Sequence, residues 1–101
     1  MKSIKLWIDD VRQMPSNFDL HARDAEEAIQ MLRDYDITHV SFDHDLGQEA
    51  SGYDIAAWVE MMAYTNELKR FTWQIHSANP VGASRIENAM KKADEFWERH
   101  G

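Results

Sequence analysis

Acidic and imidazole side chains directly follow three of the apolar segments that the sequence predicts to be strands. They are Asp9 and Asp10, then Asp43, His44 and Asp45, and finally His76. Four carboxylates in one place repel one another and lower folding stability unless a cation or shared protons neutralise them. These residue types therefore predict a site that holds a cation and transfers protons.

The predicted metal ligands are Asp9, Asp10, Asp43 and Asp45. Mg²⁺ is the expected cation, because it takes one or two carboxylates and keeps its remaining waters for a phosphorylated ligand. The neighbouring imidazoles extend the choice to Mn²⁺ or Zn²⁺.

His44 and His76 are the predicted acid–base residues. Histidine titrates near neutral pH, so either ring can act as a general acid or base. The alternative for His44 is a polar loop in which a neighbouring carboxylate orients the ring. The alternative for His76 is a hydrogen bond that caps a strand. Both alternatives stay open from the residues alone.

A phosphate is expected next to the cation. Asn79 and Pro80 are typical of the N-cap and first residue of a helix, and a helix N-terminus attracts anions. The predicted phosphate contacts are Arg12, Ser77 and Asn79, with Arg85 as a second basic residue. Three of them have a purely structural alternative. Arg12 can be a solvated surface charge, Ser77 can make a turn hydrogen bond, and Asn79 can act only as a helix cap.

The elements that must position these residues alternate along the chain. Predicted strands cover residues 5–8, 18–22, 39–42 and 71–75, and predicted helices begin after Asp24, after Gly52 and at Pro80. This alternation predicts a parallel sheet, whose ligands bind beyond the carboxyl ends of the strands. The first connection is too short for an ordinary crossover helix. It is therefore either a tight crossover or a sign that the second strand is misplaced.

Composition limits the remaining possibilities. The 101 residues, 44% of them hydrophobic, predict a single domain over residues 1–101, and the absence of cysteine excludes disulfides and thiolate metal sites. We expect a cytoplasmic protein without a signal peptide or membrane span. The net charge of −7, from 11 basic and 18 acidic residues, argues against a broad nucleic-acid surface.

Four motifs resemble those of a divergent receiver-like family described as cyclic-phosphate processing. They are Leu6-Trp7-Ile8-Asp9-Asp10-Val11-Arg12, Ser41-Phe42-Asp43-His44-Asp45-Leu46-Gly47, Ser51-Gly52-Tyr53-Asp54 and His76-Ser77-Ala78-Asn79-Pro80-Val81-Gly82. The resemblance extends over nearly the whole chain. It implies a small, truncated receiver-like (flavodoxin-like) α/β fold. Its parallel sheet of about four strands would have the order 2-1-3-4, without the first crossover helix and the last strand.

The same resemblance implies roles for the site residues. In response-regulator receivers the Asp pair binds Mg²⁺, the strand-end Asp (here Asp43) accepts a phosphoryl group, and a Ser or Thr (here Ser77) contacts it. This chain departs from signalling receivers in two ways. We find no lysine to pair with a phospho-aspartate, and the chain has two added histidines, His44 and His76. For the divergent family, the resemblance implies a role in RNA end repair or phage–host conflict.

Our leading hypothesis from the sequence is a metal-dependent phosphoesterase acting on cyclic phosphates. Its expected partner is a phosphorylated or cyclic-phosphate nucleotide, including a 2′,3′-cyclic RNA end. One alternative is a non-catalytic module that binds such a nucleotide or a protein partner. The other is a degenerate receiver that accepts a phosphoryl group at Asp43.

Overall fold

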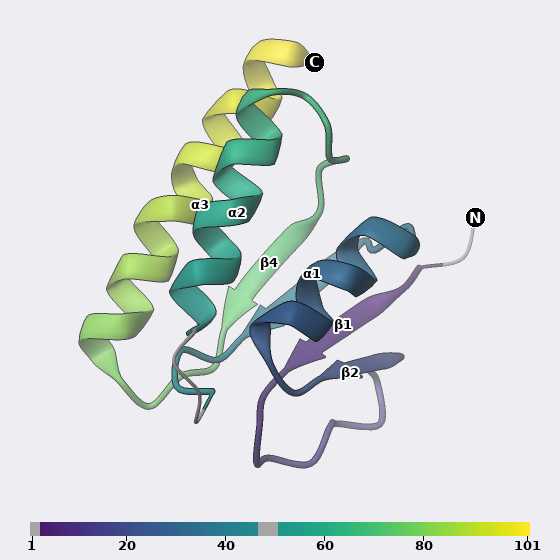
Figure 1. The fold of residues 1–101 in the computed structure, drawn as a ribbon, viewed down its shortest axis with the longest axis vertical. Helices are drawn as coiled ribbons and strands as arrows, with labels where there is room; N and C mark the ends of the chain where they lie inside the picture. Colours follow the sequence, from purple (N-terminus) through teal and green to yellow (C-terminus); the bar gives the residue numbers. More distant parts are fainter. Residues whose placement is uncertain (1–2, 47–50) are drawn as a thin grey trace.

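The computed structural model describes residues 3–46 and 51–101. Its sheet has four parallel strands: β1 (Lys5–Ile8), β2 (Leu20–Ala22), β3 (His39–Phe42) and β4 (Thr72–Ile75). They lie side by side in the order β2-β1-β3-β4, and Figure 1 shows β2 and β4 on opposite sides of β1. The expected sheet order of a truncated receiver fold is confirmed.

Three helices follow the second, third and fourth strands: α1 (Ala25–Asp34), α2 (Gly52–Tyr64) and α3 (Pro80–His100). Both predicted N-caps are confirmed. Asp24 accepts a hydrogen bond of 2.8 Å from the Glu27 N–H, and Asn79 caps α3 in the same way. None of these helices, within the two described stretches, is long and apolar enough to cross a membrane.

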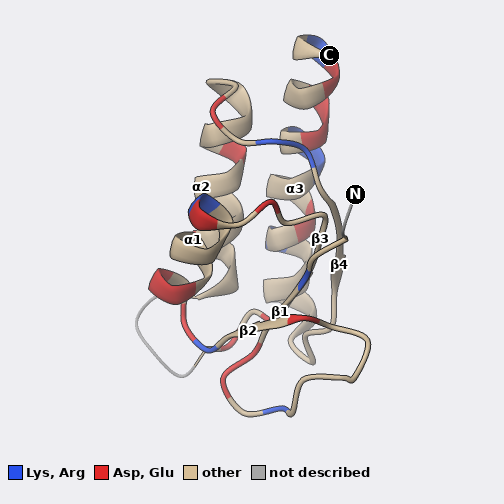
Figure 2. Cartoon of the chain, turned by 90° about the vertical axis from the view of Figure 1, so that its right-hand side faces the viewer, with Lys and Arg blue, Asp and Glu red and all other residues tan. Residues whose placement is uncertain are grey.

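The helices cover one face of the sheet, so the domain has two layers (Figure 2). Leu6 and Ile8 of β1 and Val40 and Phe42 of β3 point into this layer and are wholly buried against the helices. Side chains alternate between the faces of a strand, so Trp7 and Ser41 point to the opposite face. Lysines and arginines are dispersed in short stretches along the ribbon (Figure 2).

The face of the sheet opposite the helices, here called the open face, is polar near the amino ends of β3 and β4. There the His39 ring bonds to the Thr72 hydroxyl at 2.7 Å and to the Gln74 amide oxygen at 3.0 Å. Parallel sheets are usually covered on both faces. In this domain cross-strand hydrogen bonds between partly exposed polar side chains replace part of that cover.

Residues 9–19 form the first connection and contain no helix. The chain turns directly after β1, and Phe18 then packs edge-on against Trp7, with ring centroids 5.2 Å apart. The connection is therefore a tight crossover, and the second strand was placed correctly apart from its start. Phe18 was wrongly assigned to that strand, which begins at Leu20; its side chain covers Trp7 instead.

Candidate functional site

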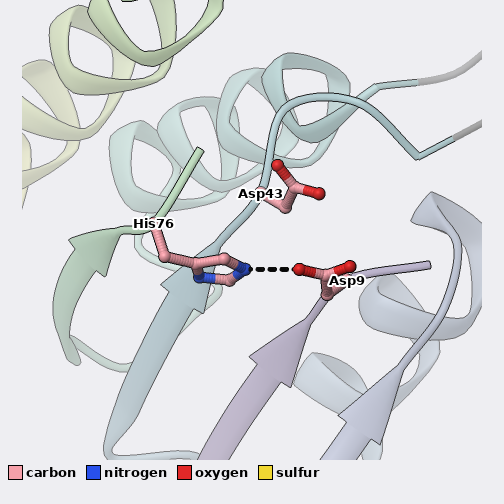
Figure 3. A group of neighbouring side chains, drawn as sticks. All are labelled: Asp9, Asp43 and His76. Atoms are coloured by element: carbon pink, nitrogen blue, oxygen red, sulfur yellow. Dashed lines mark hydrogen bonds and ion pairs between the residues drawn. The ribbon is translucent and has the colours of Figure 1, made fainter. Parts of the chain in front are cut away.

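The strand register brings three of the predicted site residues together. Within the sheet, Trp7 is paired with Ser41, and Ser41 with Gln74. Side chains two residues further along each strand point to the same face. Those residues are Asp9, Asp43 and His76, and Figure 3 shows them converging beyond the ends of β1, β3 and β4.

The backbone of each site residue is held by the neighbouring strand. Each N–H donates to a carbonyl of that strand, so the ladder continues one residue past the strand end. The bonds are Asp9 to Ala22 at 3.0 Å, Asp43 to Ile8 at 3.1 Å and His76 to Phe42 at 2.9 Å. These bonds give the site a rigid backbone frame, although its residues lie outside the strands themselves.

Asp9 is fully buried, and both of its carboxylate oxygens accept hydrogen bonds. Oδ1 accepts from the N–H groups of Val11 at 2.9 Å and Arg12 at 2.8 Å, which forms the turn after β1. Oδ2 faces Nε2 of His76 at 3.0 Å. Burial alone would raise the pKa of Asp9, but these hydrogen bonds and the nearby imidazole outweigh it and lower the pKa. Asp9 is therefore an ionised carboxylate.

Asp43 is the second buried carboxylate, with 8% of its surface exposed. Burial, followed by the negative charge of Asp9, raises the pKa of Asp43 above its ordinary value. One ligand atom from each of Asp9, Asp43 and His76 lies within 4.8 Å of the others. The environment thus disfavours the negative charge of Asp43 as long as no cation balances it.

His76 lies flat on the open face and uses both ring nitrogens. Nδ1 is 2.7 Å from the Ser41 hydroxyl, and the ring stacks on Trp7 with centroids 3.8 Å apart. Burial lowers the pKa of His76, although Asp9 and Asp43 oppose this effect. The ionised Asp9 can only accept, so Nε2 of the neutral ring carries the proton. Nδ1 therefore accepts a hydrogen bond from Ser41.

His44 and Asp45, in the loop after β3, form a hydrogen-bonded pair beside the N-terminal end of α3. Nδ1 of His44 is 2.9 Å from Oδ1 of Asp45, and this hydrogen bond, with a smaller contribution from Asn79, lowers the pKa of Asp45. Nδ1 is thus the donor, and no residue of the described chain bonds to Nε2. The ring packs so closely on Gly82 that a Cβ there would overlap it.

The three predicted phosphate contacts have structural partners. Nη1 of Arg12 donates to the His76 carbonyl at 2.7 Å, which ties the first connection to the loop after β4. Ser77 accepts from the Asn79 N–H at 3.1 Å, and the Asn79 amide oxygen accepts from the first turn of α3. Arg85 lies over the Tyr53 ring. A role for any of them in binding phosphate stays a prediction.

The predicted metal ligands are only partly assembled in the part of the chain that the structure describes. Asp9 and Asp43 lie together, and His76 completes the group, whereas Asp10 and Asp45 are not members of it. Alternation explains this for Asp10, which is adjacent to Asp9 and points elsewhere. Asp45 instead lies in the loop after β3 and pairs with His44. Whether any of these residues binds a metal stays a prediction.

Three residues around the site were not predicted as part of it. Trp7 stacks on His76, Ser41 bonds to that ring, and His21 Nε2 donates to the Asp9 carbonyl at 2.8 Å. Ser41 and Trp7 precede Asp43 and Asp9 by two residues, a spacing that could have indicated them. His21 is on another strand, and only the register places it there.

A family model described as "Cyclic-phosphate processing Receiver domain" matches residues 4–92, which include every residue of the group Asp9, Asp43 and His76. No curated protein and no solved structure gave a significant match.

Proposed function

The chain belongs to the family of cyclic-phosphate processing receiver domains, and we propose that it is a metal-dependent phosphoesterase that opens cyclic phosphates. The substrate class is a 2′,3′-cyclic RNA end or a small cyclic nucleotide. The observation that carries this proposal is the group Asp9, Asp43 and His76, whose ligand atoms lie within 4.8 Å of one another at the carboxyl edge of the sheet.

The chemistry of this group fits a divalent cation. It combines two carboxylates with one imidazole, a donor set suited to Mg²⁺ through the oxygens and to Mn²⁺ or Zn²⁺ if the nitrogen joins. The raised pKa of Asp43, caused by burial and by Asp9, means that a positive charge is favoured there. A bound cation would polarise a phosphoryl oxygen and stabilise the charge that develops during hydrolysis.

The pair His44 and Asp45 supplies the proton acceptor in this proposal. Asp45 holds the Nδ1–H of His44, which leaves the Nε2 lone pair available, as in other histidines that a carboxylate orients. Water attacks phosphorus and gives its proton to Nε2. The bond from phosphorus to one ribose oxygen breaks, and that oxygen receives the proton from His44. The product is a phosphomonoester, and the histidine returns to its neutral form.

The guanidinium of Arg12 supports binding of the phosphate. Among the residues that the structure describes, one of its five N–H donors is used, in the bond to the His76 carbonyl, and Arg12 is exposed. Its positive charge offsets a small part of the rise in the pKa of Asp43, a sign that the two side chains are close. An anionic phosphate beside Asp43 would need such a cation to limit repulsion.

Hydrolysis of a 2′,3′-cyclic nucleotide with Mg²⁺, Mn²⁺ or Zn²⁺ tests the proposal. We expect turnover with at least one cation and none in excess chelator. His44→Ala should lower kcat by about 10²–10⁴-fold, the usual contribution of a general base. The matched control is His39→Ala, since His39 lies at the opposite end of β3 and should keep wild-type activity. Equal rates in His44→Ala and wild type would remove His44 from the mechanism.

One observation favours a binding module instead. Both ring nitrogens of His76 and both carboxylate oxygens of Asp9 are already hydrogen-bonded within the protein. Binding of the cyclic nucleotide without turnover, unchanged in His44→Ala, would support this second function. Mass addition at Asp43 after treatment with a small phosphodonor would instead support a phospho-accepting receiver.

A further inference from the structure

Ser41 has a buried hydroxyl whose one hydrogen bond within residues 3–46 and 51–101 goes to His76. Ser41 is fully buried near the end of β3, and its Oγ lies 2.7 Å from Nδ1 of the ring. A serine hydroxyl can donate one hydrogen bond and also accept. It is therefore a suitable partner for either protonation state of Nδ1.

The two functions open to His76 need opposite tautomers. Because the ionised Asp9 can only accept, Nε2–H points at its carboxylate, and Nδ1 accepts from Ser41. A cation held by Asp9, Asp43 and His76 through Nε2 needs the lone pair on that nitrogen, so the proton must then be on Nδ1. A partner that could only donate would disfavour the second tautomer.

We propose that Ser41 is the positioning residue that holds the His76 ring in place in both tautomers and so permits Nε2 to exchange its hydrogen bond for a cation. In the metal-free protein the hydroxyl donates to Nδ1. With a cation on Nε2, the hydroxyl would rotate and accept from Nδ1–H. One proton leaves Nε2 for water, and one proton from water joins Nδ1. The net proton count is unchanged.

Trp7 and the backbone limit what else the ring can do during this exchange. The indole stacks against one side of the imidazole at an interplanar angle of 5°, and the His76 N–H is bonded to Phe42. The ring therefore cannot flip freely to offer a different nitrogen to the cation. Reversal of the Ser41 hydroxyl is a smaller movement than rotation of the stacked ring.

The inference depends on the cation site of the proposed function, so its test has a metal-free and a metal-bound arm. Imidazole ¹⁵N NMR of the metal-free protein should show His76 protonated at Nε2, with the Nδ1 signal shifted by an accepted hydrogen bond. In Ser41→Ala this Nδ1 signal should move to the position of a nitrogen without a donor. Ser41→Thr should restore it, and Ser84→Ala, an exposed serine of α3, should leave it unchanged.

The second arm adds Zn²⁺ alone and measures both the tautomer and the affinity. We expect the proton of wild-type His76 to move to Nδ1, and the Zn²⁺ affinity of Ser41→Ala to fall by about 10–100-fold, as for other residues that support a metal-ligating histidine. A Zn²⁺-saturated protein that keeps Nε2–H would overturn the exchange but leave a carboxylate-only cation site. Absence of Zn²⁺ binding in wild type would overturn both the exchange and the zinc form of the site.

An unchanged Nδ1 signal in Ser41→Ala would overturn the Ser41 contact itself, whatever the cation does. The two failures are thus separate: one concerns the hydrogen bond of a buried serine, and the other the cation. Unfolding curves of both Ser41 variants accompany the spectra, and Ser41→Thr keeps the test open if the alanine variant does not fold.

Discussion

The His76 imidazole lies parallel to the Trp7 indole, with ring centroids 3.8 Å apart and an angle of 5° between the planes. The two residues come from strands that are not neighbours, since β3 runs between β1 and β4. The His76 ring therefore extends across Ser41 to reach Trp7. This contact connects the buried aromatic residues of the open face to the proposed cation site.

Trp7→Ala should destabilise the domain by about 3–5 kcal/mol, the usual cost of removing a buried tryptophan. The loss combines the packing with Phe18 and the stack with His76. Trp58→Ala is the matched control, because Trp58 is only partly buried at the edge of the core and should cost less. Urea unfolding measures both variants. A cost for Trp7→Ala no larger than for Trp58→Ala would contradict the structural role given to the stack.

Asp43→Asn should stabilise the cation-free protein at pH 7. Burial and the charge of Asp9 raise the pKa of Asp43 in the folded state. A raised carboxyl pKa gives stability that is fully present below the unfolded value of 3.8 and is lost as pH rises through the folded pKa. The asparagine variant avoids that loss, so its advantage in unfolding free energy should shrink as pH falls from the folded pKa of Asp43 toward 3.8, and it should be absent below 3.8.

The same variant should respond differently to a cation. Mn²⁺ or Zn²⁺ should raise the Tm of wild type by mass action and change the Tm of Asp43→Asn much less. If Asp43→Asn is less stable than wild type at pH 7 without cation, then Asp43 is not a strained group, and the electrostatic reason for a cation disappears.

Gly52→Ala and Gly82→Ala should both be destabilising, although alanine usually stabilises a helix position relative to glycine by about 1 kcal/mol. A Cβ on Gly82 would overlap the His44 ring, and one on Gly52 would overlap the Asp43 carbonyl. The ring can shift, so we expect a cost of about 1–3 kcal/mol for Gly82→Ala and more for Gly52→Ala, whose neighbour is backbone. Chemical denaturation ranks the two, with Ser84→Ala as the control on α3.

The His44 resonances should also move in Gly82→Ala, because the ring must leave its place beside α3. A stabilising effect of this substitution, at the magnitude typical of an exposed helix position, would show that His44 does not pack there.

Arg12→Gln should weaken a phosphate ligand with little effect on the fold. Arg12 is exposed, and the loss of its single bond to the His76 carbonyl should change the unfolding free energy by less than about 1 kcal/mol. Loss of one charge-assisted contact should reduce affinity for a nucleoside 2′-phosphate by about 10–100-fold. Calorimetric titration measures it, and Arg33→Gln on α1 is the control. Equal affinity in Arg12→Gln and wild type would leave Arg12 as a tether between two loops.

Local patterns predicted the elements and the general position of the site. Asp24 and Asn79 mark their helices because their side chains bond to free N–H groups of the first turn, an interaction between residues two or three apart in sequence. Likewise, each apolar segment followed directly by acid predicts a buried strand and a polar strand end. Interactions over such short distances along the chain can be read without knowing the fold.

Local patterns did not decide which of two adjacent polar residues enters the site. Asp9 and Asp10 are both acidic and adjacent, and alternation says only that they point in opposite directions. Asp9 enters the site because α1, α2 and α3 all cover the face to which Leu6 and Ile8 point. The position of the helices thus decides which member of the doublet belongs to the site.

The order of strands and helices, the helix caps and the presence of acid and imidazole at the carboxyl edge can therefore be read from local patterns. The meeting of Asp9 and Asp43 with His76, and the support they receive from Trp7, Ser41 and His21, come from the folded domain. Strand register and helix placement arise from packing between segments far apart in the sequence, and no local pattern carries that information.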